Sequence, residues 1–250
     1  QADKFRNHPQ NPCESASHSF FSEPPFLIGQ RYNRAGADPP WIVDRWSLRK
    51  EDTQIMPNEF DSVEQAISAI ARGEIVIVVD AEDRENEGDF ICAAEKTTPE
   101  VINFMVTHGR GRPCVPILPE LAAKLKLRLM VEDNTAPLRT AFTVTVDHRS
   151  CTTGISAFER SRTVQSIVDP ATRPEDLVRP GHMDPLIARE GGVLRRAGHT
   201  EATVDLAKLA GLTPAGVLCE ILDTDGGMAR RDRLFEVARQ SGLKIISIED

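Results

Sequence analysis

The ten residues 80–89 read DAEDRENEGD, and they directly follow the apolar run IVIVV at residues 75–79. Five β-branched or aliphatic residues in a row are typical of a strand buried on both faces of a sheet, so the run predicts a central strand that ends in an acidic loop. Six of the ten loop side chains are carboxylates, grouped around the single arginine Arg84. Because like charges repel, we expect a cation there, and a hard divalent ion such as Mg²⁺ suits oxygen ligands. A solvated acidic turn without a ligand is the alternative.

Strands and helices alternate along the following part of the chain. Apolar residues at helical spacing, with Asp61 or Ser62 as a cap, predict a helix over residues 62–72. Further helices are predicted at residues 99–107, 119–126, 201–210 and 231–240, and further strands at residues 141–147, 217–221 and 244–248. The sequence contains no internal repeat and no GxGxxG turn, so it does not support a dinucleotide-binding fold.

The first 58 residues differ in composition from the remainder. They hold seven of the seventeen prolines, both tryptophans and the only tyrosine, without a sustained helical or strand period. Prolines oppose regular structure, whereas a fully disordered tail is normally poor in aromatic residues. We therefore expect residues 1–58 to be an irregular extension that packs in part on the globular body or across a subunit interface, and residues 59–250 to form one domain.

Charge and cysteine content exclude several classes of protein. A net charge of −8 argues against nucleic-acid or anionic-membrane partners, because neither would be attracted. We see no apolar stretch long enough for a membrane span and no basic segment before an apolar one, as a secretory signal would need. The five cysteines are scattered and form no CxxC pair, so neither a zinc knuckle nor a disulfide framework is indicated. We expect a reducing, cytoplasmic location.

Several motifs occur in an order that resembles one enzyme family, 3,4-dihydroxy-2-butanone 4-phosphate synthase, over about residues 60–250. They are DREN and EGD in the acidic loop, TAFTV at residues 140–144, TTGIS at 152–156, RPGH at 179–182, GHTEA at 198–202, LAGLTPAGVLCE at 209–220 and DGGMAR at 225–230. The resemblance implies a layered α-β-α domain of the α/β (α+β) class with a mixed sheet. It also implies a homodimer with shared active sites, which converts ribulose 5-phosphate to 3,4-dihydroxy-2-butanone 4-phosphate and formate with a divalent metal.

The metal ligands are expected to be one carboxylate and one imidazole. Positions matching the family's metal ligands are Glu85 and His199, and because imidazole suits softer ions better, Mn²⁺ is expected to substitute for Mg²⁺. A lone histidine is as often structural as a ligand, and it is the GHTEA context that favours a metal role here. Arg196, Gly198 and Thr200 surround His199 where a helix is expected to begin, and free N–H groups there attract phosphate.

The remaining site residues follow from the same resemblance. His182 and Glu220 match the family's two acid–base positions, Asp89 its sugar-hydroxyl acceptor and Cys114 a thiol that lines the substrate, so these four are the expected catalytic residues. A buried inert thiol is the alternative for Cys114, and simple neutralisation of its acidic neighbours is the alternative for Arg84. The expected substrate-binding residues are Arg84, Glu85, Asp89, Thr152, Arg196, Ala197, Gly198, His199, Thr200 and Glu220.

Four positions depart from the family pattern: Ala81, Arg139, Asp184 and Ile187. Asp184 replaces an aromatic residue two positions after His182, where it could act on that imidazole or add a metal ligand. One alternative is therefore a related metal-dependent enzyme that acts on ribulose 5-phosphate or another phosphosugar to give a different product. A non-catalytic binding protein that works through its aromatic extension is a third. Because the sequence ends without the cyclohydrolase domain to which the family is sometimes fused, the expectation is that this chain acts alone.

Overall fold

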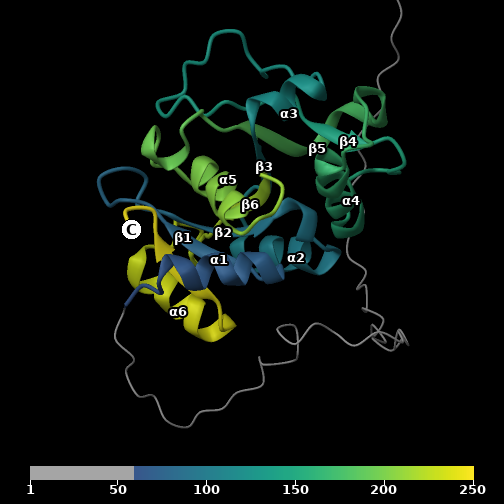
Figure 1. Ribbon diagram of the computed structural model, residues 1–250. Coiled ribbons are helices and arrows are strands. Elements are labelled where there is room, and N and C mark those ends of the chain that lie inside the picture. The colour runs from purple at the N-terminus through teal and green to yellow at the C-terminus, as the bar shows by residue number, and fades with distance from the viewer. Residues whose placement is uncertain (1–58) are drawn as a thin grey trace, which may run out of the picture. The chain divides into compact units, whose positions relative to one another are not determined.

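A seven-stranded mixed sheet lies at the centre of the computed structural model, which describes residues 59–250 (Figure 1). The strands are β1 Val76–Val79, β2 Gly88–Ala93, β3 Cys114–Ile117, β4 Val146–His148, β5 Leu177–Ile187, β6 Gly216–Glu220 and β7 Lys244–Ser247. Their order is β4-β5-β3-β6-β2-β1-β7. The pairs β1–β7 and β3–β5 are parallel, and the other neighbours are antiparallel. The expected mixed sheet in an α/β domain is confirmed.

Helices cover both faces of this sheet. They are α1 Val63–Arg72, α2 Pro99–Phe104, α3 Pro119–Lys124, α4 Ala157–Val168, α5 His199–Leu209 and α6 Arg231–Ser241, with a π-helical turn at Met105–Gly109 and 3₁₀ turns at Ala94–Lys96, Pro174–Asp176 and Gly192–Leu194. α1 and α5 share one apolar core with β1, β2, β6 and β7. α2 packs on α4, and α6 contacts β1 and β7. Within residues 59–250, no helix combines the length and the apolar character that crossing a membrane requires.

The predicted opening of the domain is confirmed in detail. Ser62 caps α1 by accepting a hydrogen bond from the Gln65 N–H, and Gly73 ends the helix in the left-handed region at φ 82°. All four residues of β1 are buried. Val76 and Val78 belong to the core that β1 shares with α1 and α5. Because side chains alternate along a strand, Ile77 faces the opposite layer, so β1 is covered on both sides.

The same alternation decides which strand residues face α5. Ile91 of β2 and Leu218 of β6 belong to the α1–α5 core, so Asp89 and Glu220, two positions away, point to that face as well. Helix α5 packs closely on β6, as is shown by Gly216, where an added Cβ would overlap the side chain of Thr203. The acidic end of β2, the last residue of β6 and the start of α5 therefore meet on one face of the sheet.

Strand β7 binds both β1 and the residues that lead into α1. β7 pairs with β1 in parallel, from Val76 opposite Lys244 to Val79 opposite Ser247. The Asp61 N–H donates to the Ile245 carbonyl at 2.8 Å, and the Asp61 carboxylate accepts the Ile245 N–H at 3.0 Å and the Lys244 ammonium at 2.6 Å. The entry to α1 is thus held by the end of the domain.

Two predictions differ from the structure in the region of β4 and β5. The strand expected at residues 141–147 is confined to β4, because the Thr143 N–H bonds to the Pro185 carbonyl outside a regular ladder. The Pro180–Gly181 pair before His182 predicts a turn, but both residues lie inside β5, after a cis Arg179–Pro180 peptide. The Gly181 N–H still finds an acceptor, Thr145 Oγ1 at 2.9 Å. Strand pairing with β4, interrupted by a bulge, replaces the expected turn.

Other differences concern the limits of elements. The predicted helix at residues 99–107 is α2, which ends at Phe104 and continues as the π-helical turn. The helices predicted at residues 119–126, 201–210 and 231–240 correspond to α3, α5 and α6, and the strands at residues 217–221 and 244–248 to β6 and β7, within two residues at each end. The expectations for residues 1–58 lie outside the described residues, so the domain boundary stays a prediction.

Candidate active site

A cavity of about 220 Å³ opens on the α5 face of the sheet. Its walls come from the acidic loop, from the ends of β2, β3, β5 and β6, and from the start of α5. Eight of the residues expected from the sequence line it: Arg84, Glu85, Asp89, Cys114, Arg196, His199, Thr200 and Glu220. The fold therefore brings most of the predicted site into one place.

Asp80 and Arg230 hold the backbone of the acidic loop in place. Asp80 is fully buried, and its carboxylate accepts the N–H groups of Glu85 at 3.1 Å and Glu87 at 2.8 Å. Arg230 Nη1 donates to the carbonyls of Glu85 and Asn86. Because backbone groups at both ends of this turn are held, the direction of the Glu85 side chain is set by the loop.

Three groups that could hold a metal ion converge beside this loop. Ligand atoms of Asp80, Glu85 and His199 all lie within 4.8 Å of one another, and His199 Nδ1 is 3.4 Å from Glu85 Oε2. The Asp80 oxygens already accept the two loop N–H groups and an ion pair with Arg84 at 2.8 Å. Glu85 and His199, the pair expected from the sequence, are therefore the groups best placed to bind an ion.

Two buried atoms support this assignment. His199 is 6% exposed, and its Nε2 atom has no hydrogen-bond partner among the described residues. The same holds for Asp89 Oδ1, on the neighbouring strand. Buried polar atoms are normally satisfied, so two unsatisfied ones beside a carboxylate–imidazole pair indicate a ligand. Carboxylate oxygen and imidazole nitrogen are donors that fit a divalent cation such as Mg²⁺ or Mn²⁺.

The titrating groups of the cavity reflect the crowding of carboxylates around one imidazole. Burial opposes the charged form of His199, but Asp89, the hydrogen bond with Glu85, and Asp80 outweigh it and raise the His199 pKa to about 9. The hydrogen bond from His199 in turn lowers the pKa of Glu85. Burial raises the pKa of Asp89 to about 7, with further contributions from the carboxylates of Glu220 and Glu85. Perturbed groups of this kind gather at functional sites.

Positive charge gathers at the start of α5. The cap residue Gly198 offers no side chain to the first N–H groups of the helix, whereas Ser62, Thr98 and Ser156 cap α1, α2 and α4. A Cβ on Gly198 would lie 2.5 Å from Arg196 Nη1 and 2.8 Å from Arg84 Nη2.

Two guanidinium groups and a helix N-terminus therefore surround one small residue. Arg196 is held by Glu201 at 2.7 Å and by Thr140 Oγ1 at 3.2 Å. Arg84, for which substrate contact is expected and neutralisation of its neighbours is the alternative, pairs with Asp80 and Glu85 and also lines the cavity. This arrangement suits the phosphate group of a ligand.

Glu220 closes the opposite side of the cavity. It stands opposite Asp89 in the antiparallel β2–β6 pair, and its Oε2 accepts the Arg112 N–H at 2.8 Å. A Cβ on Gly111 would lie 2.7 Å from the same oxygen, so this glycine permits the close approach. Cys114 lines the cavity next to it. Burial first, and then the carboxylates of Glu220 and Asp184, raise the pKa of the Cys114 thiol well above its ordinary value, so the thiol stays protonated.

Asp184, which departs from the family pattern, binds an arginine. It lies opposite Cys114 in the parallel β3–β5 pair, and its carboxylate accepts two hydrogen bonds from Arg112, one of them from Nε at 2.9 Å. The Arg112 guanidinium also lies 5.3 Å from the centre of the Phe142 ring, a wall of the cavity. Of the two roles expected for Asp184, the structure gives it neither a contact with His182 nor a place among the grouped metal donors.

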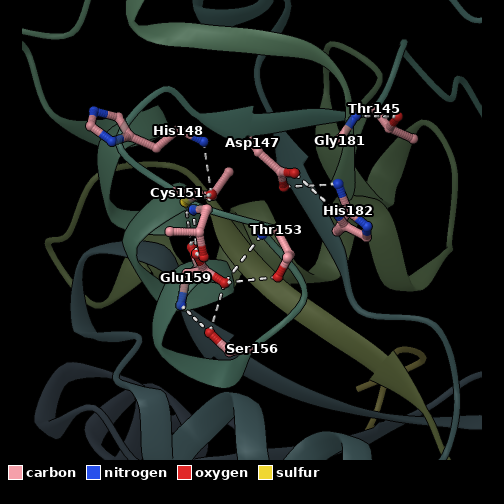
Figure 2. Close-up of polar contacts among 12 residues, drawn as sticks. Thr145, Asp147, His148, Cys151, Thr153, Ser156, Glu159, Gly181 and His182 are labelled. Carbon is pink, nitrogen blue, oxygen red and sulfur yellow. Dashed lines mark hydrogen bonds and ion pairs between the residues drawn. The ribbon is translucent and has the colours of Figure 1, made fainter.

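Four expected site residues do not line the cavity: His182, Thr152, Ala197 and Gly198. Ala197 and Gly198 stand between the wall residues Arg196 and His199, whereas the other two lie elsewhere on the chain. His182 belongs to a second polar cluster, where its ring pairs with Asp147 (Figure 2). Thr152 donates its N–H and its hydroxyl to Glu159, at 2.6 and 2.8 Å.

Five wall residues were not singled out from the sequence: Glu87, Thr140, Phe142, Leu186 and Leu218. Thr140 and Phe142 belong to the TAFTV motif, so the motif itself was a usable signal. Leu218 precedes Glu220 by two positions, and strand alternation would have placed both on one face. Leu186 could not be found in this way, because β5 was not predicted.

The comparisons with known proteins agree with this geometry. The sequence profile of the 3,4-dihydroxy-2-butanone 4-phosphate synthase family matches residues 64–250. The chain belongs to this family. Synthase-family relatives include the riboflavin biosynthesis protein RibBA of Cytophaga hutchinsonii, 60% identical over 194 residues, and that of Bacillus mycoides, 59% identical over 191 residues. These matches cover 77% and 76% of this chain and 48% of either relative, so the chain spans about half the length of the curated relatives it matches.

Solved structures of synthase-family members have the same fold. RibBX of A. baumannii, described as a two-domain 3,4-dihydroxy-2-butanone 4-phosphate synthase, is 49% identical with a TM-score of 0.73, over 75% of this chain and 56% of that one. A synthase solved in complex with two magnesium ions is 43% identical with a TM-score of 0.74, over 76% of this chain and 94% of that one.

Proposed function

We propose that this chain converts ribulose 5-phosphate to 3,4-dihydroxy-2-butanone 4-phosphate and formate, as a metal-dependent lyase of riboflavin biosynthesis. The observation that carries the proposal is the cavity itself. A carboxylate–imidazole pair, Glu85 and His199, stands directly beside the two guanidinium groups that flank Gly198. A sugar phosphate that also chelates a metal needs metal ligands and phosphate-binding cations close enough for one substrate molecule to reach both. Membership of the synthase family supports the same conclusion.

A divalent cation, Mg²⁺ or Mn²⁺, bound by Glu85 and His199 would polarise the ketose carbonyl and stabilise the enediolate that forms when a neighbouring proton is removed. Arg84, Arg196 and Thr200 would bind the phosphate at the start of α5, where the helix dipole adds to their charge. This fixes one end of the substrate and directs its carbonyl end towards Glu85.

Two carboxylates on the sheet would handle protons. Asp89 and Glu220 are cross-strand neighbours on the cavity wall. Burial raises the pKa of Asp89 to about 7, so this carboxyl can hold or release a proton near neutral pH. Glu220 is kept in one orientation by the Arg112 N–H. Cys114, as a protonated thiol, would line the substrate and not act as a nucleophile.

His182 and Thr152 would act on the cavity of a second subunit. The resemblance makes His182 an acid–base residue, yet on its own chain it does not line the cavity. A two-fold homodimer that shares its active sites reconciles the two observations, since each subunit would supply one cavity and one His182. We also propose a cytoplasmic location, because the four cysteines of the described part carry free thiols, as a reducing compartment favours.

Formate release from ribulose 5-phosphate in the presence of Mg²⁺ tests the proposal. We expect metal-dependent formate from the native protein and none from His199→Ala or Glu220→Ala, with all three equally folded by circular dichroism. Absence of formate from the native protein, with ribulose 5-phosphate still bound in a metal-dependent way, would overturn the proposed product and favour a related phosphosugar reaction.

Mixed dimers test the shared site. Subunits carrying His182→Ala and subunits carrying His199→Ala, co-expressed with different tags, give a heterodimer with one intact site and one doubly defective site. If sites are shared, the purified heterodimer should show about half of the native activity, although each parent is inactive. An inactive heterodimer would contradict sharing, since each chain would then need both of its own histidines.

A further inference from the structure

A second polar cluster lies on β4, β5 and the turn before α4 (Figure 2), and none of the residues labelled there lines the cavity. At its centre, Asp147 faces His182. Asp147 Oδ1 accepts the backbone N–H of His182 at 2.8 Å, and Asp147 Oδ2 lies 2.7 Å from the ring atom Nδ1 of the same residue. Asp147 is 5% exposed, whereas the His182 side chain is 43% exposed. One buried carboxylate thus holds both the backbone and the ring of an accessible histidine.

Two glycines make room for this contact. A Cβ on Gly154, which has a φ of +88°, would overlap the Asp147 carboxylate. A Cβ on Gly181 would overlap the backbone of Val146, so β5 could not approach β4 at this point with a larger residue. The Gly181 N–H is taken by Thr145 Oγ1. The TTGIS and RPGH motifs therefore meet at Asp147, and the backbone is shaped for the carboxylate.

The contact decides which ring nitrogen carries the proton. An ionised carboxylate only accepts hydrogen bonds, so the neutral His182 ring must carry its hydrogen on Nδ1 and keep the lone pair on Nε2. Because the ring is held from the Nδ1 side by a buried group, Nε2 is directed away from Asp147 and towards the exposed side of the ring.

We propose that Asp147 is a positioning residue for His182. It fixes the Nδ1–H tautomer and directs Nε2 out of its own subunit, where Nε2 accepts a proton from the substrate in the partner's cavity and returns it in a later step. The proposal rests on the proposed function for its catalytic part. The control of the tautomer stands on the geometry of this chain alone.

The variant Asp147→Asn tests the proposal sharply, because it should move the His182 ring hydrogen from Nδ1 to the other ring nitrogen. The oxygen of the new amide must still accept the His182 N–H, so its NH₂ group would face Nδ1 and turn that atom into an acceptor. The ring hydrogen then moves to Nε2, which can no longer take a proton. The control Asp176→Asn makes the same chemical change at a carboxylate that bonds Arg173 and Arg149 and has no contact with His182.

Ring-nitrogen chemical shifts of ¹⁵N-histidine-labelled full-length protein measure the tautomer, with the His182 signals assigned by their loss in His182→Gln. We expect Nδ1–H in the native protein and in Asp176→Asn, and Nε2–H in Asp147→Asn. Unchanged His182 shifts in Asp147→Asn would overturn the inference whatever happens to activity. Shifts that respond, in a native protein that releases no formate, would overturn the proposed function and leave the tautomer control standing.

Kinetics and mixed dimers test the catalytic part. Asp147→Asn should lower kcat by at least about 100-fold with KM for ribulose 5-phosphate within about twofold, because the phosphate and metal groups are untouched. A heterodimer of Asp147→Asn with His199→Ala should regain about half of the native activity, and one of Asp147→Asn with His182→Ala almost none. Recovery in the second heterodimer would show that the two residues serve different sites and would overturn the pairing.

Discussion

Gly198 sets how closely two guanidinium groups approach the first turn of α5. Arg84 and Arg196 both reach Gly198, and each is paired with at least one carboxylate, so neither can move away without breaking an ion pair. The small residue between them leaves the space that a phosphate oxygen would need. Its importance follows from the two cations and not from any unusual backbone conformation, since its φ is −127°.

Gly198→Ala is therefore expected to weaken phosphate binding without unfolding the protein. The added methyl group would lie against both guanidinium groups and displace them. We expect KM for ribulose 5-phosphate, and the inhibition constant of inorganic phosphate, to rise by roughly tenfold, equivalent to about 1.4 kcal/mol. Gly227→Ala, in an exposed turn, is the matched control and should leave both constants unchanged. Equal constants in native and Gly198→Ala protein would show that phosphate binds elsewhere.

Arg112 and Asp184 form an ion pair between an exposed and a buried side chain, which gives a second prediction. The Asp184 side chain is 7% exposed and that of Arg112 is 56% exposed. Arg112→Met would leave a buried carboxylate without its partner, so we expect a loss of about 2 kcal/mol of unfolding free energy, after allowing for the exposure of the arginine. The melting temperature should fall by roughly 5 °C.

Replacing both members should restore most of that stability. Arg112→Met together with Asp184→Phe puts an apolar pair where the ion pair stood, and such replacements are often neutral. Arg149→Met, which breaks an exposed contact with Asp176, is the control and should change little. A double variant no more stable than Arg112→Met alone would contradict the explanation.

Sequence patterns located the cavity residues well and the second cluster poorly. Glu85, His199 and Glu220 were predicted because each stands in a short sequence motif that matches a metal-ligand or acid–base position of the family. Asp147 was not singled out, because its role depends on the packing of β4 against β5, which no local pattern reveals. The partner of Asp184 was missed for the same reason, since Arg112 is distant in the sequence.

At the level of elements, the turn before α4 is organised by one side chain. Glu159 accepts the N–H and hydroxyl of Thr152, the N–H of Gly154 at 3.1 Å and the hydroxyl of Ser156 at 3.0 Å. The N–H of Glu159 bonds back to Ser156 at 3.2 Å, so helix and turn stabilise each other. These bonds, the Thr152 N–H foremost and its hydroxyl next, lower the Glu159 pKa from 4.5 to about 2.

The sign of the resulting pH dependence can be stated. A carboxyl whose pKa is lower in the folded protein stabilises the fold above the unfolded pKa, and that contribution disappears as the pH falls from about 4.5 towards 2. Glu159→Gln should therefore unfold at a lower urea concentration than the native protein at pH 7, with a difference that shrinks as the pH is lowered through this range. A difference that is the same at pH 7 and pH 3 would rule out the Glu159 charge as the cause.

The elements predicted from sequence were those with an unambiguous period. α1, β1, β6 and β7 combine regular apolar spacing with clear ends. β2 was hidden because its first residues, Gly88 and Asp89, read as part of the acidic loop. β5 was hidden because it contains Pro180 and Pro185 and is exposed over its first half, and prolines argue against a strand unless it lies at an edge or a bulge. α4 was missed because its apolar face is narrow and interrupted by buried Ser161 and Thr163.

At the scale of the whole molecule, residues 59–250 contain the sheet, its covering helices and the cavity. The family match begins at residue 64, inside α1. We propose that residues 1–58 are an extension that the site does not need. The proposed homodimer could not be predicted from periodicity or composition, because a shared site depends on how two copies meet.

Deleting residues 1–58 should accordingly leave formate release within about twofold of that of the full chain, because the described cavity residues all lie between positions 84 and 220. Turnover and the melting curve of the two proteins should be measured at equal subunit concentration. Loss of turnover with an unchanged melting curve would assign the extension to the active site or the subunit interface, and loss of a binding partner alone would favour the interaction-protein alternative.

The parallel pairing of β7 with β1 has a consequence for how the protein is made. A ribosome synthesises about 5–20 residues per second, so β1 emerges on the order of ten seconds before β7 does. During that interval one edge of the central apolar strand has no partner, and Asp61 cannot yet anchor the entry to α1. Until residues 244–247 arrive, this edge of β1 is open to pairing with another chain, which is the hazard that an uncovered apolar strand edge carries.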